Sequence, residues 1–157
     1  MIYLLCLSEL AGVIALFFAV ARGGFLGFGR LQQALKVIVT LPRVISGSVH
    51  LVMPAVLAPM IPPVFPARTL LVVLSGLLEL AGAAGLRLRR TQRSASLAIA
   101  LLMVAVFPAN IYVAGQTVHG LRMPSVSVRL LMQIVYIVLV LMAGWGRPLL
   151  RTPARPQ

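Results

Sequence analysis

Six ionisable or amide side chains within the long apolar runs of this 157-residue sequence are candidates for chemistry. They are Arg43, His50, Glu79, Asn110, Arg129 and Gln133. Such groups are costly in an apolar environment, so they normally face the interior of a helix bundle or a water-filled cavity. Three roles are open to them: fastening helices together, binding a polar ligand, or passing protons or ions.

Glu79 has the most demanding position of the six, because it lies near the middle of an apolar run. An isolated carboxylate there would cost several kcal/mol, so we expect it to be protonated or paired. Arg43 is the expected partner in a structural ion pair, and Arg129 is the second candidate. Such a pair fixes how two helices face each other, even where desolvation cancels the attraction.

The remaining polar residues form a candidate ligand site. Arg129 and Gln133 are four residues apart and therefore share one helix face. With a cytoplasmic carboxyl terminus, these two residues, His50 and Asn110 all fall in the outer half of the membrane. We therefore expect an outward-facing polar pocket in which they and Glu79 contact a small ligand.

The heptapeptide "VFPANIY", residues 106–112, places a proline and an amide in one apolar run. Pro108 removes the helical hydrogen bond to the carbonyl of Val104 and is expected to kink the helix. A carbonyl freed in lipid needs a partner inside the protein. Asn110, with two amide donors, is expected to serve a neighbouring helix or a ligand.

Several other kinds of site are not expected. His50 and His119 have no adjacent carboxylate or cysteine, so we predict no metal site. The single cysteine, Cys6, excludes dithiol chemistry within one chain, and no cofactor is expected. The net charge of +12 is not accompanied by a basic face that alternates with stacking aromatics, so no nucleic-acid partner is expected. "GGFLGFG" follows an apolar run and is interpreted as a turn rather than a phosphate loop.

The composition predicts the elements that position these residues. The sequence is 61% hydrophobic and only 10% charged, with a mean hydropathy of +1.04, whereas soluble domains have about 25% charged residues. Roughly 20 apolar residues of helix cross a bilayer. Five segments qualify, at about 2–21, 33–54, 69–86, 94–116 and 126–146. The predicted fold is an all-α, polytopic transmembrane helical bundle, and the lipid bilayer is its first partner.

The apolar segments and the breakers between them predict the domain organisation, and the distribution of arginine predicts the orientation in the membrane. Residues 1–30 are expected to be a retained N-terminal transmembrane helix with a Gly-rich linker; a cleaved signal peptide or a misplaced start site are the alternatives. Residues 31–146 form the bundle and 147–157 a basic tail. The proline-rich stretch "PAVLAPMIPPVFP" cannot be a regular spanning helix and is expected to cap the bundle. Basic loops favour the cytoplasm, which places the carboxyl terminus inside.

Five short motifs in order resemble those of the DoxX-like family of small integral membrane proteins. They are "GSVH" at 47–50, "PPVFP" at 62–66, "SGLLE" at 75–79, "FPAN" at 107–110 and "RLLMQ" at 129–133. The resemblance covers about residues 40–140 and implies a four-helix core, to which the first segment adds a helix. It also implies a multi-pass protein of the inner (plasma) membrane, with the pocket residues above as candidate cavity residues.

The function expected from the residues and the resemblance together is that of a membrane protein without catalytic activity of its own. Its pocket would take a small ligand, a lipid or a quinone, or the chain would anchor a membrane or redox partner protein. The alternative is a membrane subunit of a quinone- or sulfur-linked oxidoreductase, in which Glu79 or His50 moves protons. No catalytic residue is assigned.

Overall fold

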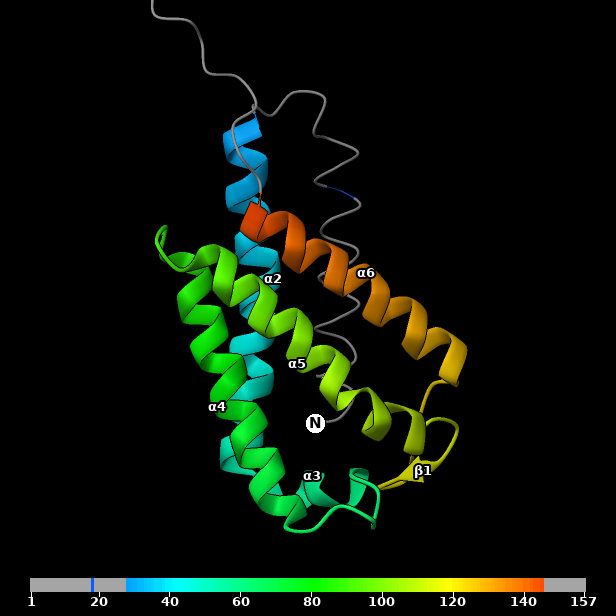
Figure 1. Ribbon diagram of the computed structural model, residues 1–157. Helices are drawn as coiled ribbons and strands as arrows, with labels where there is room; N and C mark the ends of the chain where they lie inside the picture. Colours follow the sequence, from blue (N-terminus) through cyan, green and yellow to red (C-terminus); the bar gives the residue numbers. More distant parts are fainter. Residues whose placement is uncertain (1–17, 19–27, 146–157) are drawn as a thin grey trace, which may run out of the picture.

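Four long helices make up most of the described part of the chain and run alternately in opposite directions. The computed structural model describes Phe18 and residues 28–145. The helices are α2 (Phe28–Val52), α4 (Arg68–Arg87), α5 (Gln92–Tyr112) and α6 (Val126–Trp145), drawn from blue to orange in Figure 1. The predicted all-α helical bundle is therefore confirmed. The first apolar segment, apart from Phe18, and the basic tail lie outside the described residues.

The helices enclose one interior, with α2 against α4 and α6, and α5 against α4 and α6. Each contains at least 20 residues that are apolar enough to cross a membrane. At about 1.5 Å per residue, 20 residues span roughly the 30 Å of a bilayer's hydrocarbon core. Large apolar side chains face outward, such as Leu101 and Leu131, which are 66% and 64% exposed. The protein is accordingly an integral membrane protein.

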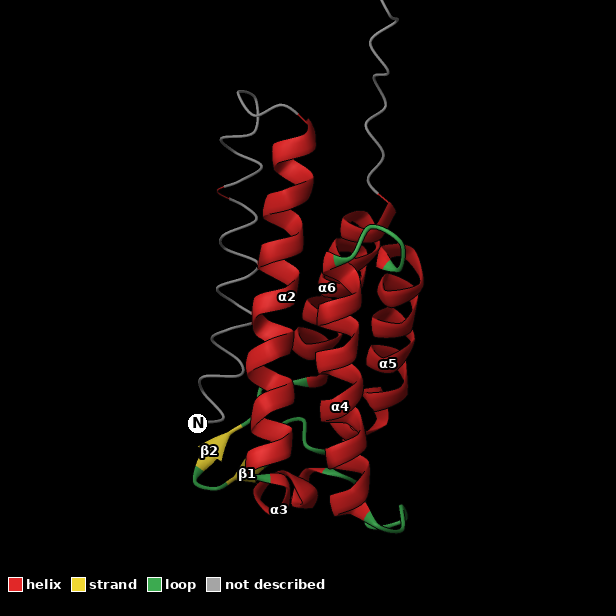
Figure 2. Ribbon diagram, turned by 90° about the vertical axis from the view of Figure 1, so that its left-hand side faces the viewer, coloured by secondary structure: helices red, strands yellow, loops and turns green. Residues whose placement is uncertain are grey.

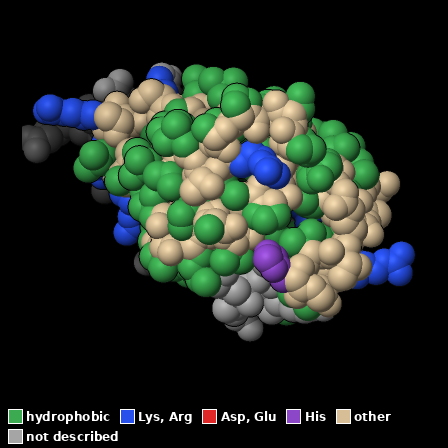
Figure 3. All heavy atoms as spheres, turned by 90° about the horizontal axis from the view of Figure 1, so that it is seen from below, with side chains coloured by type: hydrophobic (Ala, Val, Ile, Leu, Met, Phe, Trp, Pro, Cys, Tyr) green, Lys and Arg blue, Asp and Glu red, His purple; other side chains and the backbone are tan. Residues whose placement is uncertain are grey.

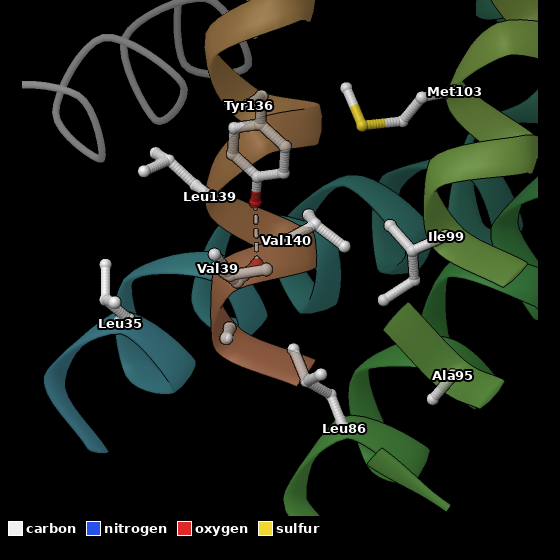
Figure 4. Close-up of a cluster of buried hydrophobic side chains, with 10 residues drawn as sticks. Leu35, Val39, Leu86, Ala95, Ile99, Met103, Tyr136, Leu139 and Val140 are labelled. Atoms are coloured by element: carbon white, nitrogen blue, oxygen red, sulfur yellow. Dashed lines mark hydrogen bonds between the residues drawn. The ribbon is translucent and has the colours of Figure 1, made fainter. Parts of the chain in front are cut away.

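The core of the bundle is a cluster of aliphatic side chains from all four long helices. It includes Val39, Leu86, Ile99 and Val140, each at most 1% exposed (Figure 4). Tyr136 lies among them, and its hydroxyl donates to the backbone carbonyl of Val39 over 2.6 Å. The aliphatic packing and this bond together hold α6 against α2.

Glycines allow neighbouring helices to approach closely, for example at Gly76 and Gly144. A Cβ added at Gly76 of α4 would lie 2.6 Å from the Cβ of His50 on α2. A Cβ added at Gly144 of α6 would collide with Ser96 of α5, whose hydroxyl donates to the carbonyl of Val140 over 2.8 Å. Only glycine permits such close helix approach, so both contacts depend on it.

One end of the bundle is covered by short elements, and we call it the capped end. These are α3 (Pro54–Leu57), the 3-10 helix η2 (Ala58–Met60) and a hairpin of β1 (Thr117–Val118) and β2 (Leu121–Arg122), all at the lower end of Figure 2. The hairpin turns at His119 and Gly120, whose φ angles of 49° and 78° fit a two-residue type I′ turn. The ring of His119 lies 3.0 Å from the carbonyl of Val56, which joins the hairpin to α3.

The opposite end has the α4–α5 connection and is called the basic end. Arg87, Arg89, Arg90 and Arg93 all have exposed side chains there. On the capped end, the exposed arginines of the described residues are Arg68 and Arg122. The two ends of the described bundle therefore differ in charge in the predicted sense, with more exposed arginines at the basic end than at the capped end.

Two predicted boundaries and one predicted loop differ from the structure. The helix expected at 33–54 begins at Phe28, inside the predicted glycine-rich turn. The helix expected at 94–116 ends at Tyr112, because Gly115 takes a φ of 73° and a hairpin strand begins at Thr117. The proline-rich stretch contains no spanning helix, as predicted, but its first half forms α3 and η2 rather than a plain loop.

Candidate functional site

Hydrogen bonds and ion contacts divide the six sequence-predicted residues into two groups. The α2–α4 group consists of Arg43, Glu79, His50 and its partner Ser75. The α5–α6 group consists of Asn110, Arg129 and Gln133. The five residues expected to line one pocket thus fall into two sets of contacts, one centred on α2 and α4 and the other on α5 and α6.

The centre of the α2–α4 group is an ion pair. Arg43 Nη1 lies 3.0 Å from Glu79 Oε1, and the two side chains are 6% and 5% exposed. The Arg43 guanidinium also lies over the Tyr136 ring, 4.4 Å from its centroid. Charge, hydrogen bond and ring contact therefore fix α2, α4 and α6 relative to one another, as an ion pair at this depth was expected to do.

Glu79 uses one of its two carboxylate oxygens in this pair. Its Oε2 is buried and has no hydrogen-bond partner among the described residues. A buried acceptor without a donor is costly, and it marks a place where a proton, a water molecule or a ligand donor would be stabilised.

His50 and Ser75 form the second contact of the α2–α4 group, at 3.2 Å between Nδ1 and Oγ. The Ser75 hydroxyl donates its proton to the carbonyl of Val72 over 2.8 Å. A hydroxyl has one proton, so with that proton donated to Val72 the first bond requires the His50 tautomer that carries its proton on Nδ1. In this tautomer Nδ1 donates to Ser75, and the pair is a structural contact between α2 and α4.

The α5–α6 group is a chain of three hydrogen bonds. Arg129 Nη1 donates to Asn110 Oδ1 over 2.9 Å, and Asn110 Nδ2 donates to Gln133 Oε1 over 3.4 Å. Gln133 Nε2 then donates to the carbonyl of Met103 over 3.0 Å. Asn110 thus serves a neighbouring helix. A side-chain donor reaches the backbone of α5 five residues before Pro108, at Met103 rather than at the expected Val104.

Arg129 differs from Arg43 in having no acidic partner among the described residues. Its Nη2 lies 3.2 Å from the thioether sulfur of Met123, a weak acceptor, and its Nε is buried without a partner there. Arg129 does not pair with Glu79, whose ion pair is with Arg43. The α5–α6 group therefore has a positive charge and spare donors at the capped end.

Sequence reasoning missed four participants: Ser75 as a hydrogen-bond partner, Tyr136, Met123 and the carbonyl of Met103. Tyr136 could have been found, because it follows Gln133 by three residues and so lies on the same face of α6. Met123 and a backbone carbonyl have no signal in sequence. At the basic end, Lys36 Nζ donates to Gln92 Oε1 over 2.6 Å, a contact between residues distant in sequence that was also missed.

Metal-ligand chemistry is not supported by the described residues, which contain no group of three His, Cys, Asp or Glu side chains. What the two groups offer instead is hydrogen bonding: an acceptor at Glu79 and donors at Arg129. A ligand with an anionic or strongly accepting group fits the α5–α6 group best.

Comparison with curated proteins gives no match, and comparison with solved structures gives none. One family model, described as a domain of unknown function (DUF8561), matches residues 39–144. The match takes in more than half of the chain and contains both groups of polar residues. The chain therefore belongs to the DUF8561 family.

Proposed function

We propose that this protein is a DoxX-like protein of the inner membrane that is not catalytic by itself and binds a small ligand, a lipid or a quinone at the α5–α6 group. The observation that carries the proposal is Arg129, a cation at membrane depth whose hydrogen-bond partners in the described residues are an amide oxygen and a thioether. A ligand acceptor would complete its coordination.

The order of five DoxX-like motifs along the chain and the four-helix arrangement support the family part of this proposal. The charge asymmetry supports the orientation, since four exposed arginines lie at the basic end and basic loops favour the cytoplasm. The capped end would then face outward, and the carboxyl terminus would be cytoplasmic.

Packing alone is the competing explanation, because amides often fasten membrane helices with about 0.6 kcal/mol per contact. The bond from Gln133 to the carbonyl of Met103 fits that role. The incompletely bonded Arg129 does not, since a fastener gains nothing from a charge without an acceptor.

The test compares two amides of the same helix, α5. Asn110→Leu removes the amide of the proposed site, whereas Gln92→Leu removes the amide bonded to Lys36 at the basic end. The full chain is extracted gently from its own membrane, and retained small molecules are identified by native mass spectrometry. We expect a ligand of defined mass in the wild type and in the Gln92 variant, and its loss in the Asn110 variant. A bare chain in all three would contradict the proposal.

A further inference from the structure

Arg129 has a positive charge that the described residues do not balance. Glu79 is the only acidic residue in the described part of the chain, and it is bonded to Arg43 at 3.0 Å. Seen from the capped end, basic side chains and a histidine lie among hydrophobic ones, and no described acidic side chain is in view (Figure 3). A charge in this setting needs a counter-charge from beyond the described residues.

The coordination of the guanidinium points to an acceptor with more than one oxygen. A guanidinium has five N–H donors. One of them is bonded to Asn110 Oδ1 at 2.9 Å, and one faces the Met123 sulfur at 3.2 Å. Phosphate and carboxylate groups accept two parallel bonds from such a fork, whereas a thioether accepts one weak bond.

Arg129 lies close enough to one end of α6 for its side chain to reach the phosphate groups of a lipid leaflet. Arg129 follows the start of α6 at Val126 by three residues, which is about 5 Å along the helix axis. A helix of 20 residues spans about the hydrocarbon thickness, and the headgroup region beyond it is a few Å deep on each side. An arginine side chain reaches from this position to the headgroups.

We infer that Arg129 binds an oxyanion, and that this oxyanion is the phosphate of a phospholipid headgroup in the leaflet at the capped end. The inference rests on the proposed function and names its ligand class. Asn110 and Gln133 act as positioning residues, because their hydrogen-bond chain holds the guanidinium against α5. A free oxyanion such as inorganic phosphate has the same chemistry and is the other source.

The experiment titrates the full-length protein in detergent with phosphatidylglycerol and with a diacylglycerol of the same acyl chains, counting bound lipids by native mass spectrometry. Inorganic phosphate is tested separately by the shift in thermal unfolding. The variants are Arg129→Gln and, as a control with equal charge loss, Arg122→Gln, an exposed arginine at the same end.

We expect Arg129→Gln to weaken phosphatidylglycerol binding about tenfold or more, since the charge-assisted hydrogen bonds to the phosphate are lost. Arg122→Gln should leave it unchanged, and diacylglycerol binding should not depend on Arg129. Equal weakening by both variants, or no weakening by Arg129→Gln, would overturn the inference. Arg129-dependent stabilisation by inorganic phosphate without lipid binding would support the oxyanion and overturn the lipid as its source.

Two further results keep the inference separate from the proposed function. A retained neutral ligand that requires Asn110 but not Arg129 would leave the proposed function standing and overturn the inference. Retention that depends on neither residue would overturn both. If Arg129→Gln does not fold, Arg129→Lys keeps the charge and loses the fork; it should weaken phosphatidylglycerol binding several-fold, and wild-type affinity would contradict the bidentate contact.

Discussion

The α2–α4 and α5–α6 groups each contain an arginine inside an apolar bundle, but the partners of the two guanidinium groups differ. Arg43 has a carboxylate at 3.0 Å and an aromatic ring beneath it. Arg129 has an amide oxygen and a sulfur. The first arrangement holds two opposite charges within the bundle, whereas the second leaves one charge for something else to complete. This contrast separates residues that serve the fold from residues that are candidates for function.

The largest expected loss of stability comes from breaking the ion pair of the α2–α4 group. Glu79→Gln removes the carboxylate 3.0 Å from the buried Arg43, and removing one partner of a buried pair costs about 3–5 kcal/mol. Arg129→Gln should cost about 1 kcal/mol or less, because no opposite charge is stranded. Unfolding in a detergent of fixed composition, followed by circular dichroism, compares the two variants. Equal losses would remove the distinction between the groups.

The next largest loss of stability is expected where α2 and α4 pack closely beside the α2–α4 group. Gly76→Ala places a methyl group 2.6 Å from the Cβ of His50 and 2.9 Å from the carbonyl of Gly47. Overpacking of this kind costs about 1–3 kcal/mol and should separate α2 from α4. Ala81→Val, on the exposed side of α4, adds more volume and is the control. A thermal unfolding midpoint lowered only by the Gly76 substitution is the expected result, and an unchanged midpoint would show that the two helices can part without cost.

The smallest loss of stability is expected at Tyr136 of α6, whose ring contacts Arg43 of the α2–α4 group. Tyr136→Phe keeps the ring beneath Arg43 and removes the hydroxyl bond to the carbonyl of Val39, at a cost of about 1 kcal/mol. Ligand retention at the α5–α6 group should not change. A stability measurement and native mass spectrometry on the same sample check both parts, and lost retention would show that the two groups are coupled.

The sequence predicted the helices far better than it predicted their contacts. Apolar length and breakers located all four described helices, and depth alone identified Arg43 as the expected partner of Glu79. Depth could not show that His50 belongs with Ser75 rather than with Asn110, because lateral position in a bundle depends on which helices are neighbours. The hairpin at Thr117–Arg122 was missed as well, since the helix predicted at 94–116 was extended to the residue before it.

The lengths of the helices have a consequence for the surrounding bilayer. α2 contains 25 residues and the other three long helices 20 or 21, so α2 is about 7 Å longer at 1.5 Å per residue. In Figure 2 the excess projects beyond the bundle on the side away from α3 and the hairpin. The hydrocarbon core of a thicker membrane would therefore extend beyond the ends of α4, α5 and α6, whereas α2 would still span it. Such hydrophobic mismatch costs fractions of a kcal/mol per Å. The three shorter helices match a hydrocarbon core of about 30 Å, whereas α2 is the one helix of the described four that is long enough to extend into the headgroup region at the basic end.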